Sequence, residues 1–237
     1  MKMDNIERFK KTIKKEIDFL EKRLSAKGVY EQAIYMGYLD ADRTFENQSK
    51  IKKDDSEVEK IAVKMKSYID SDRDDFDTMF YEVCEDLCNN YDGMKFGQAQ
   101  KIINMAFKYL YCIADNNVRP RFNKCHMPLD GIMLEWIHRN LKDKDGKVIK
   151  KVDSWSKIDK GTEDKDEADT YLYYKKCIDK YCKENNKTPL QLDFEHWVEM
   201  SQVIAAENYV KNFVKEELNE NKHIKLLEKP VREKMEA

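Results

Sequence analysis

One stretch of the chain, residues 96 to 113, carries apolar side chains almost all the way round a helix. Its apolar residues fall on one face and on both flanks of that face: Ala99, Ile102, Ile103, Ala106, Phe107, Tyr109, Leu110 and Ile113. A helix that is apolar on nearly every side is buried on nearly every side. The chain is therefore expected to fold around this helix, whose one polar strip holds Lys101, Asn104 and Lys108 at helical spacing.

The composition supports a mostly helical fold. Only 7 Gly and 4 Pro occur in 237 residues, which leaves little material for the frequent turns of an all-β protein. Apolar residues make up 41% of the chain, enough for one fair-sized core. We expect an all-α protein whose residues 1–237 form one compact unit, with two helical subdomains around a cleft as the alternative.

Apolar residues recur at helical spacing in most of the chain. The expected helices cover residues 6–24, 30–45, 56–68, 76–90, 98–113, 133–141, 170–184, a segment that begins at Pro189, and 205–218. Ser56 and Thr188 are the expected N-caps of two of them. Residues 142–169 are highly charged and are expected to form a loop or insertion anchored by Trp155, and residues 219–237 a frayed tail.

No export or membrane signal is visible. No apolar run approaches the roughly 18 residues that span a bilayer, and the first residues lack the apolar stretch of a signal peptide. We therefore expect a soluble, cytoplasmic protein with no membrane partner. Its six cysteines are expected to be reduced core residues, with a zinc site built from the pairs Cys84/Cys88 and Cys177/Cys182 as an alternative.

Charge is unevenly distributed along the chain. Residues 95–151 hold 12 Lys and Arg against 5 Asp and Glu, whereas the remainder holds 32 against 41. A polyanion such as DNA would be drawn to the middle of the chain and repelled elsewhere.

Lys101 lies four residues after Gly97, where we expect the first turn of the central helix. There, the positive end of the helix dipole and partial desolvation both disfavour the ammonium form. A lysine amine that is neutral for part of the time is a nucleophile able to form a Schiff base. The N–H groups around Gly97, Gln98 and Ala99 are expected to point outward at the same helix end, where they could hold a phosphate.

Asp130 follows Pro128 and precedes an apolar helix, so one expectation is that it caps this helix. The other is that its carboxylate faces Lys101, where it would accept a proton or stabilise positive charge on a sugar ring.

Both segments resemble parts of the helix-hairpin-helix DNA glycosylases, and the archaeal 8-oxoguanine glycosylase type is the most similar. That family carries a glycine-bearing hairpin, a lysine in the first turn of the next helix, and a catalytic aspartate just before another helix. The string Gly97-Gln-Ala-Gln-Lys101 is similar to the hairpin and lysine, and Met127-Pro-Leu-Asp130 to the aspartate segment. The resemblance covers residues 96–141. It departs from the pattern at Ala99, where a second glycine is usual, in the absence of Leu-Pro before Gly97, and in the lack of an iron-sulfur cysteine motif.

The resemblance implies a monomeric DNA glycosylase, with or without lyase activity, that needs no metal or organic cofactor. Lys101 and Asp130 would be its catalytic residues, on either side of a flipped base. The DNA-binding residues would be Gly97, Gln98, Ala99, Lys108, Arg119, Arg121, Lys124 and His126. The candidates for its base pocket are Phe96, Asn104 and Trp155.

Two other functions fit parts of the sequence. The amphipathic segment 6–24 is typical of a non-enzymatic helical protein, of a phage or mobile element, that binds another protein. In such a protein Lys101 would pack outward or pair with a surface carboxylate, and would not face Asp130 across a cleft. The spacing of Arg121 and His126 matches the Arg-x4-His motif of helical ribonucleases, although Phe122 stands where a polar residue is usual.

Overall fold

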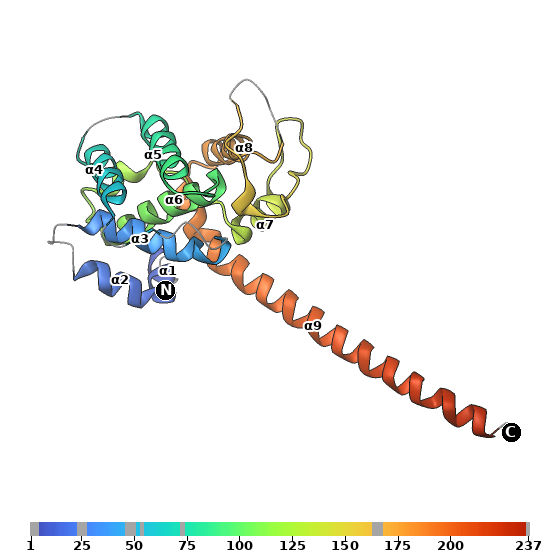
Figure 1. Ribbon diagram of the computed structural model, residues 1–237. Coiled ribbons are helices and arrows are strands. Elements are labelled where there is room, and N and C mark those ends of the chain that lie inside the picture. Colours follow the sequence, from blue (N-terminus) through green and yellow to red (C-terminus); the bar gives the residue numbers. More distant parts are fainter. Residues whose placement is uncertain are drawn as a thin grey trace. The chain divides into compact units, whose positions relative to one another are not determined.

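The computed structural model describes residues 5–22, 28–45, 51–52, 55–71, 74–162 and 168–235, of which Arg43 and residues 216–235 are described by their backbone alone. Within these ranges all regular structure is helical, and the only β-type pairing is an isolated bridge between Lys142 and Val148 (Figure 1). The prediction of an all-α fold is confirmed.

The helices lie close to the predicted ranges. In chain order they are α1 Asn5–Thr12, α2 Lys14–Glu21, α3 Val29–Ala41, η1 Asp42–Thr44, α4 Ser56–Asp70, α5 Phe76–Asn90, α6 Phe96–Ile113, η2 Arg119–Phe122, α7 Gly131–Asn140, η3 Trp155–Lys157, α8 Tyr171–Glu184 and α9 Pro189–Met235. None of these helices combines the length and the low polarity that a bilayer-spanning segment needs.

The chain divides into two units, Met1–Val198 and Glu199–Ala237. The first unit contains all the helices from α1 to α8 and the first turns of α9. In the second, the described backbone is α9 alone as far as Met235. This division differs from the single unit expected for residues 1–237.

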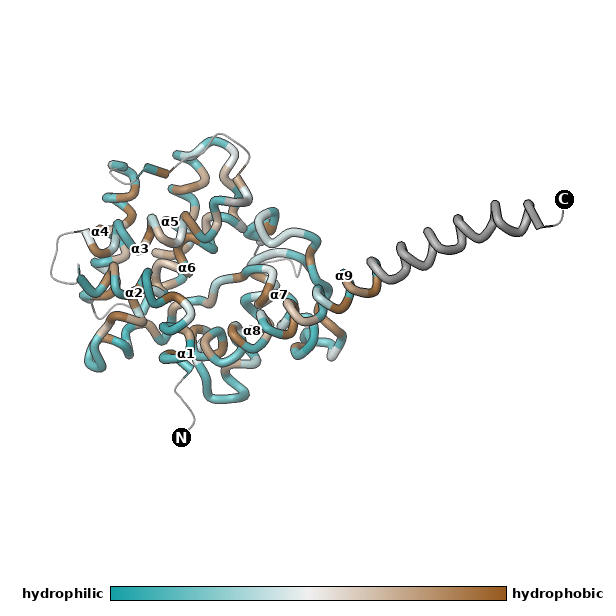
Figure 2. The backbone as a smooth tube through the Cα atoms, turned by 90° about the horizontal axis from the view of Figure 1, so that it is seen from below, coloured by the Kyte–Doolittle hydropathy of each residue, from teal (hydrophilic) through white to brown (hydrophobic). Residues whose placement is uncertain are grey.

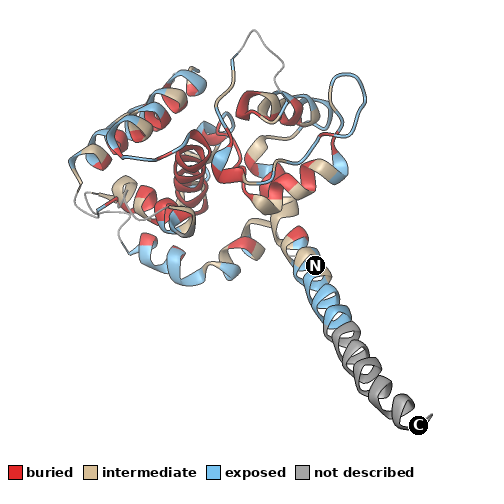
Figure 3. Ribbon diagram, turned by 45° about the vertical axis from the view of Figure 1, so that its right-hand side comes forward, coloured by how far each residue is buried: buried red, intermediate tan, exposed pale blue. Residues whose placement is uncertain are grey.

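The buried centre of the first unit is α6. Sixteen of its residues are buried, including the polar Gln100, Lys101, Asn104 and Lys108 (Figure 3). Its most extensive neighbour is α3, followed by α5, and apolar residues recur along all three helices (Figure 2). The expected central buried helix is confirmed.

Close approach of α3 to α6 depends on Gly37. A Cβ atom placed there would lie 2.3 Å from the carbonyl oxygen of Ile102, a distance that side chains do not adopt. The absence of a side chain therefore lets the two backbones touch.

Several helix ends differ from the sequence-based expectation. The predicted helix 6–24 is interrupted at Ile13, and residues 23 and 24 lie outside the described ranges. Asp55, not Ser56, caps α4, because its carboxylate accepts the N–H of Glu57 at 3.0 Å. Thr188 caps α9 as predicted, accepting the N–H of Gln191 at 3.3 Å.

α9 is longer than predicted. Its helical backbone continues without a break past Leu218 to Met235, through the segment expected to fray.

The described residues between 142 and 169 form the predicted loop, which contains one short helical turn, η3. Residues 163–167 lie outside the described ranges. Trp155 anchors it as expected and is 8% exposed. The loop lies against the start of α6, where a Cβ atom at Gly97 would come within 2.2 Å of the Trp155 carbonyl oxygen. The first turn of α6 is thus covered by this loop.

Candidate functional site

The structure brings Lys101 and Asp130 together. The Lys101 Nζ lies 3.5 Å from the Asp130 Oδ2, and the two side chains are only 6% and 8% exposed. They come from successive helices, Lys101 from α6 and Asp130 from the residue before α7. A buried ion pair of this kind is costly to desolvate, so it is an uncommon feature of a helical core.

Asp130 both caps α7 and faces Lys101. Its Oδ1 accepts the backbone N–H groups of Ile132 and Met133, each at 3.0 Å, which makes it the N-cap of α7. Its Oδ2 faces Lys101 and accepts the indole N–H of Trp197 at 3.1 Å. Three N–H groups and an ammonium therefore surround the carboxylate, an environment that suits its negative charge.

Lys101 is in a setting that differs from the expectation. Because α6 begins at Phe96, Lys101 lies in the second turn, where the effect of the helix dipole is weak. Its ammonium faces the Asp130 carboxylate and lies 4.6 Å from the centre of the Trp155 ring. Both neighbours, a carboxylate and the face of an aromatic ring, attract a cation.

Trp155 closes the site. Besides Lys101 it contacts the start of α7, where a Cβ atom at Gly131 would lie 3.8 Å from the Trp155 Cδ1. The indole therefore lies against the helix that follows Asp130 as well as against the lysine. None of the three cavities described for this structure is lined by Lys101 or Asp130, so the open cleft implied for this pair is not observed.

A second buried ion pair joins Lys108 to Asp193 of α9. The two side chains are 1% and 0% exposed, and the Lys108 Nζ also lies 3.7 Å from the centre of the Phe9 ring. Burial raises the pKa of Asp193, and the positive charge of Lys108 opposes this shift. The Lys108 side chain is enclosed by its partners, so its position in this structure does not support the predicted contact with DNA.

The two ion pairs share a neighbour, Trp197. Its N–H group binds Asp130, and its ring lies 5.3 Å from the Lys108 Nζ. One side chain of α9 thus contacts Asp130 of the first pair and Lys108 of the second.

Amide side chains link α6 to the loop before α7. Gln100 donates to the Leu129 carbonyl oxygen at 2.8 Å and accepts the Leu129 N–H at 3.2 Å. Asn104 donates to Gln100 at 3.1 Å and to the Tyr171 hydroxyl at 3.1 Å. Asn104, expected in a base pocket, is instead a fully buried part of this network.

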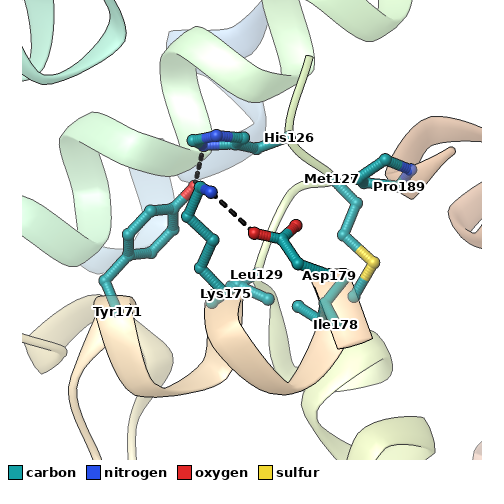
Figure 4. Close-up of a pocket in the computed structure, with 8 residues that line it drawn as sticks. All are labelled: His126, Met127, Leu129, Tyr171, Lys175, Ile178, Asp179 and Pro189. Carbon is teal, nitrogen blue, oxygen red and sulfur yellow. Dashed lines mark hydrogen bonds and ion pairs between the residues drawn. The ribbon is translucent and has the colours of Figure 1, made fainter. Parts of the chain in front are cut away.

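His126 continues the network towards the surface. Its Nδ1 lies 2.9 Å from the Tyr171 hydroxyl and its Nε2 lies 2.7 Å from the Asp77 carboxylate. Figure 4 shows His126 and Tyr171 facing each other, beside the ion pair of Lys175 and Asp179.

Burial lowers the pKa of His126 in spite of Asp77, which favours the charged ring. A neutral ring fits the geometry, with the Tyr171 O–H donating to Nδ1 and the Nε2–H donating to Asp77. Burial tends to raise the pKa of Asp77, but hydrogen bonding and charge from His126 and Lys175 lower it to about 2. Since Lys175 lies 3.1 Å from Asp77, the carboxylate keeps a cationic neighbour even when His126 is neutral. His126 is therefore an interior residue, and the prediction that it binds DNA is not supported by its position.

The start of α6 is not an open phosphate site. Gly97, Gln98 and Ala99 are all buried. The Gln98 side chain accepts the N–H of Lys95 at 2.9 Å and donates to the Thr44 carbonyl oxygen at 3.0 Å. Together with the covering loop, these contacts exclude a phosphate from this helix end, contrary to the prediction.

The remaining predicted residues fall into two groups. Phe96 is a core residue whose ring lies 5.2 Å from that of Tyr171. Arg121 and Lys124 are exposed and Arg119 is half-buried. The Arg121 guanidinium donates to the Ile69 carbonyl oxygen at 2.6 Å, and Lys124 lies 3.3 Å from Asp74. Arg119, Arg121 and Lys124 therefore remain candidates for contact with a polyanion.

The sequence analysis did not identify Asp193, Trp197, Gln100 and Tyr171 as site residues. Asp193 carries the clearest signal, because it is an acidic residue between the apolar Leu192 and Phe194 near the start of a helix. Such a residue is either exposed or paired, and the apolar neighbours favour the second.

The cysteines do not form a metal site. All six are free thiols, and no group of three or more His, Cys, Asp and Glu side chains in the described ranges is placed to hold a metal ion. Burial raises the pKa of the Cys84 and Cys125 thiols well above the ordinary value. The zinc alternative built from the two cysteine pairs is therefore not supported.

Comparison of the chain with protein-family models, with curated proteins and with solved structures gave no match.

Proposed function

We propose that the protein is a DNA glycosylase in which Lys101 and Asp130 act on the sugar of a flipped nucleotide. The observation that carries the proposal is the 3.5 Å contact between these two side chains, which come from the second turn of α6 and from the N-cap of α7. This is the pairing that the resemblance to helix-hairpin-helix glycosylases implies. The partner would be duplex DNA, bound by a monomer.

The surroundings of Asp130 favour an electrostatic role. Because its oxygens accept three N–H groups, the carboxylate suits the stabilisation of positive charge better than the acceptance of a proton. Such charge develops on the sugar as its bond to the base breaks and the electron pair leaves with the base.

Lys101 would supply first a proton and then a nucleophile. Its ammonium passes a proton to the departing base, and the lone pair that is freed forms a bond from Nζ to C1′. Transfer of a second proton from Nζ to the ring oxygen opens the sugar and leaves a Schiff base. A strand break could follow from this intermediate, which would make the protein a lyase as well.

Access requires that Trp155 move, because its ring occupies the space beside the Lys101 ammonium. The loop that carries it has only one short helical turn, η3, between Leu141 and Tyr171 in the described ranges. A loop with little regular structure is easier to displace than a packed helix. A base that stacks where Trp155 now lies would face both catalytic groups.

Borohydride trapping tests the proposal on the unmodified chain. Duplexes that each carry one damaged or modified base are incubated with the protein and sodium borohydride, which reduces a Schiff base to a stable bond. We expect a covalent adduct whose modified peptide contains Lys101. A panel of lesions that gives neither an adduct nor base release, or an adduct at another lysine, would contradict the proposal.

A non-enzymatic role is the second candidate. It is favoured by the three N–H groups that already bind Asp130, and by the three described cavities, none of which is lined by Lys101 or Asp130. Against it, Lys101 faces inward to Asp130, whereas an outward lysine was expected for a protein of this kind. The ribonuclease alternative gains no support, since Arg121 binds the Ile69 carbonyl oxygen while His126 binds Asp77 and Tyr171. RNA degradation that survives Lys101→Gln would restore it.

A further inference from the structure

The largest of the three described cavities lies away from both ion pairs. It is a groove of about 580 Å³ between the start of α3, the second half of α4, the end of α6 and η2. Its apolar wall includes Val29, Ala62, Val63, Leu110, Ile113 and Phe122. Val63 is 67% exposed, so one side of the groove is open to solvent. The volume and the lining of this groove match those of small-molecule sites, which are mostly apolar with a few polar groups.

The charged residues of this groove are mainly acidic. Glu31, Asp70 and Asp115 line it, and Lys66 is the only cationic side chain among its described residues. Lys66 is already paired with Asp70. Two further carboxylates, Glu31 and Asp115, thus lie among the lining residues beside the apolar wall, while the Arg121 guanidinium is bound to the carbonyl oxygen of Ile69, another lining residue.

The pKa of Tyr30 is consistent with an apolar and acidic environment. Tyr30 also lines the groove, and burial together with the negative charge of Asp70 raises the pKa of its hydroxyl to about 12. An aromatic ring at an acidic, apolar site is a favourable neighbour for a cation.

We propose that this groove binds a small organic cation, with an apolar body against the α4 and α6 wall and an ammonium group beside Glu31 and Asp115. The apolar wall accounts for the body of the ligand, and the excess of carboxylates selects its charge. This site is separate from Lys101 and Asp130, and the inference does not depend on the proposed glycosylase activity.

Three probes of nearly equal size separate the effect of ligand charge on affinity from the effect of the apolar ring system. Isothermal titration of the full chain at pH 7 would compare 1-naphthylmethylamine, which is cationic, with the neutral 1-naphthalenemethanol and the anionic 1-naphthylacetate. We expect the cation to bind about tenfold or more tightly than the anion, with the alcohol between them, since two nearby carboxylates contribute on the order of 1 kcal/mol or more.

Two matched variants locate the binding. Val63→Lys places a positive charge at the rim of the groove at an exposed helical position, and should weaken binding of the cation about tenfold or more. Val148→Lys makes the same change at a residue that is 52% exposed and does not line the groove, and should leave binding unchanged. Equal affinity for the three probes, no binding of the cation, or equal effects of the two variants would overturn the proposal.

Discussion

Lys101 and Asp130 are buried together as an ion pair. A buried ion pair gains little net stability, since desolvation of two charges offsets their attraction, but loss of one partner leaves an uncompensated charge. Because the Lys101 side chain is 6% exposed and paired with Asp130, its removal is expected to destabilise the fold.

Lys101→Gln should therefore lower the free energy of unfolding by about 3 kcal/mol, because it leaves the Asp130 carboxylate without a cation in the core. Urea unfolding followed by circular dichroism measures the change. The double variant Lys101→Gln/Asp130→Asn should lower the free energy of unfolding by less than the two single substitutions do in sum. The second substitution removes the carboxylate charge that the first leaves without a partner. Lys60→Gln, at an exposed lysine paired with Glu57, is the control and should change stability by less than about 0.5 kcal/mol. Strict additivity of the two site variants would contradict the coupling.

His126 should make stability depend on pH near neutrality. Its pKa in the folded state is lowered from 6.5 by burial, so the unfolded chain takes up the proton first as pH falls. The stability that the neutral ring provides is complete above pH 6.5 and is lost as pH falls towards the folded-state pKa, with a slope of at most about 1.4 kcal/mol per pH unit. Urea unfolding between pH 8 and pH 5 tests this. His126→Gln should flatten the curve, and an unchanged slope in that variant would assign the effect to another group.

At the level of elements, the contact between α3 and α6 limits what Gly37 can become. Gly37→Ala would place a Cβ atom 2.3 Å from the Ile102 carbonyl oxygen and force the helices apart, at a cost of about 1–3 kcal/mol. Gly131→Ala is the matched control, because its Cβ atom would meet only the Trp155 ring at 3.8 Å. We expect a clear drop in thermal midpoint for the first variant and little change for the second. Equal midpoints would mean that the two helices can separate freely.

The loop around Trp155 should control access to Lys101. Trp155→Ala removes the ring that lies 4.6 Å from the ammonium, so reductive methylation of Lys101 by formaldehyde and borohydride should become faster. Mass spectrometry of the Lys101 peptide measures the rate. Trp136→Ala, at a tryptophan that is also buried but packs on Tyr181 and His196, controls for general loosening of the fold. Similar acceleration in both variants would argue against a local cover.

Helices and their local signals were largely predictable from the sequence. The period of apolar residues located α3 to α8 to within a few residues, and Asp130 and Thr188 are caps as expected from their positions. Such features depend on neighbours within one or two turns. The interruption at Ile13 was missed, because the apolar period continues through it.

Partners far along the chain could not be predicted in the same way. Lys108 is on the polar strip of α6, but nothing near it in the sequence indicates that Asp193 and Phe9 enclose it. The contact between Lys101 and Asp130 was one of two expectations for Asp130, and the family resemblance implied it as well. The cover formed by Trp155 has no local signal, since it depends on how a long loop returns to the start of α6.

For the whole molecule, the excess of positive charge in residues 95–151 is smaller at the surface than in the sequence. Lys101 and Lys108 are buried in ion pairs, so they cannot contribute to attraction of a polyanion. Only exposed or half-buried basic residues, such as Arg119, Arg121 and Lys124, would then attract a polyanion.

If this region contacts DNA, replacing these three residues with alanine should flatten the dependence of log affinity on log salt by up to about three units, roughly 0.9 for each lost phosphate contact. Fluorescence anisotropy with duplex DNA at several salt concentrations measures the slope. The control replaces Lys10, Lys11 and Lys14, which lie in the net-acidic part of the chain, and should change the slope little. Equal slopes for both triple variants, or no binding at low salt, would favour a protein partner over DNA.

The two buried ion pairs also affect the order in which the chain can fold. They join α6 to Asp130, to Asp193 and Trp197 in the first turns of α9, and to Phe9 in α1, so they unite segments from both ends of the first unit. Contacts between such distant segments require large loops to close first, so they are expected to form late in folding. Because a lysine does not give up water until its carboxylate is in place, these pairs should form after the rate-limiting step. Their strength would then govern how slowly the native state opens, and not how quickly it forms.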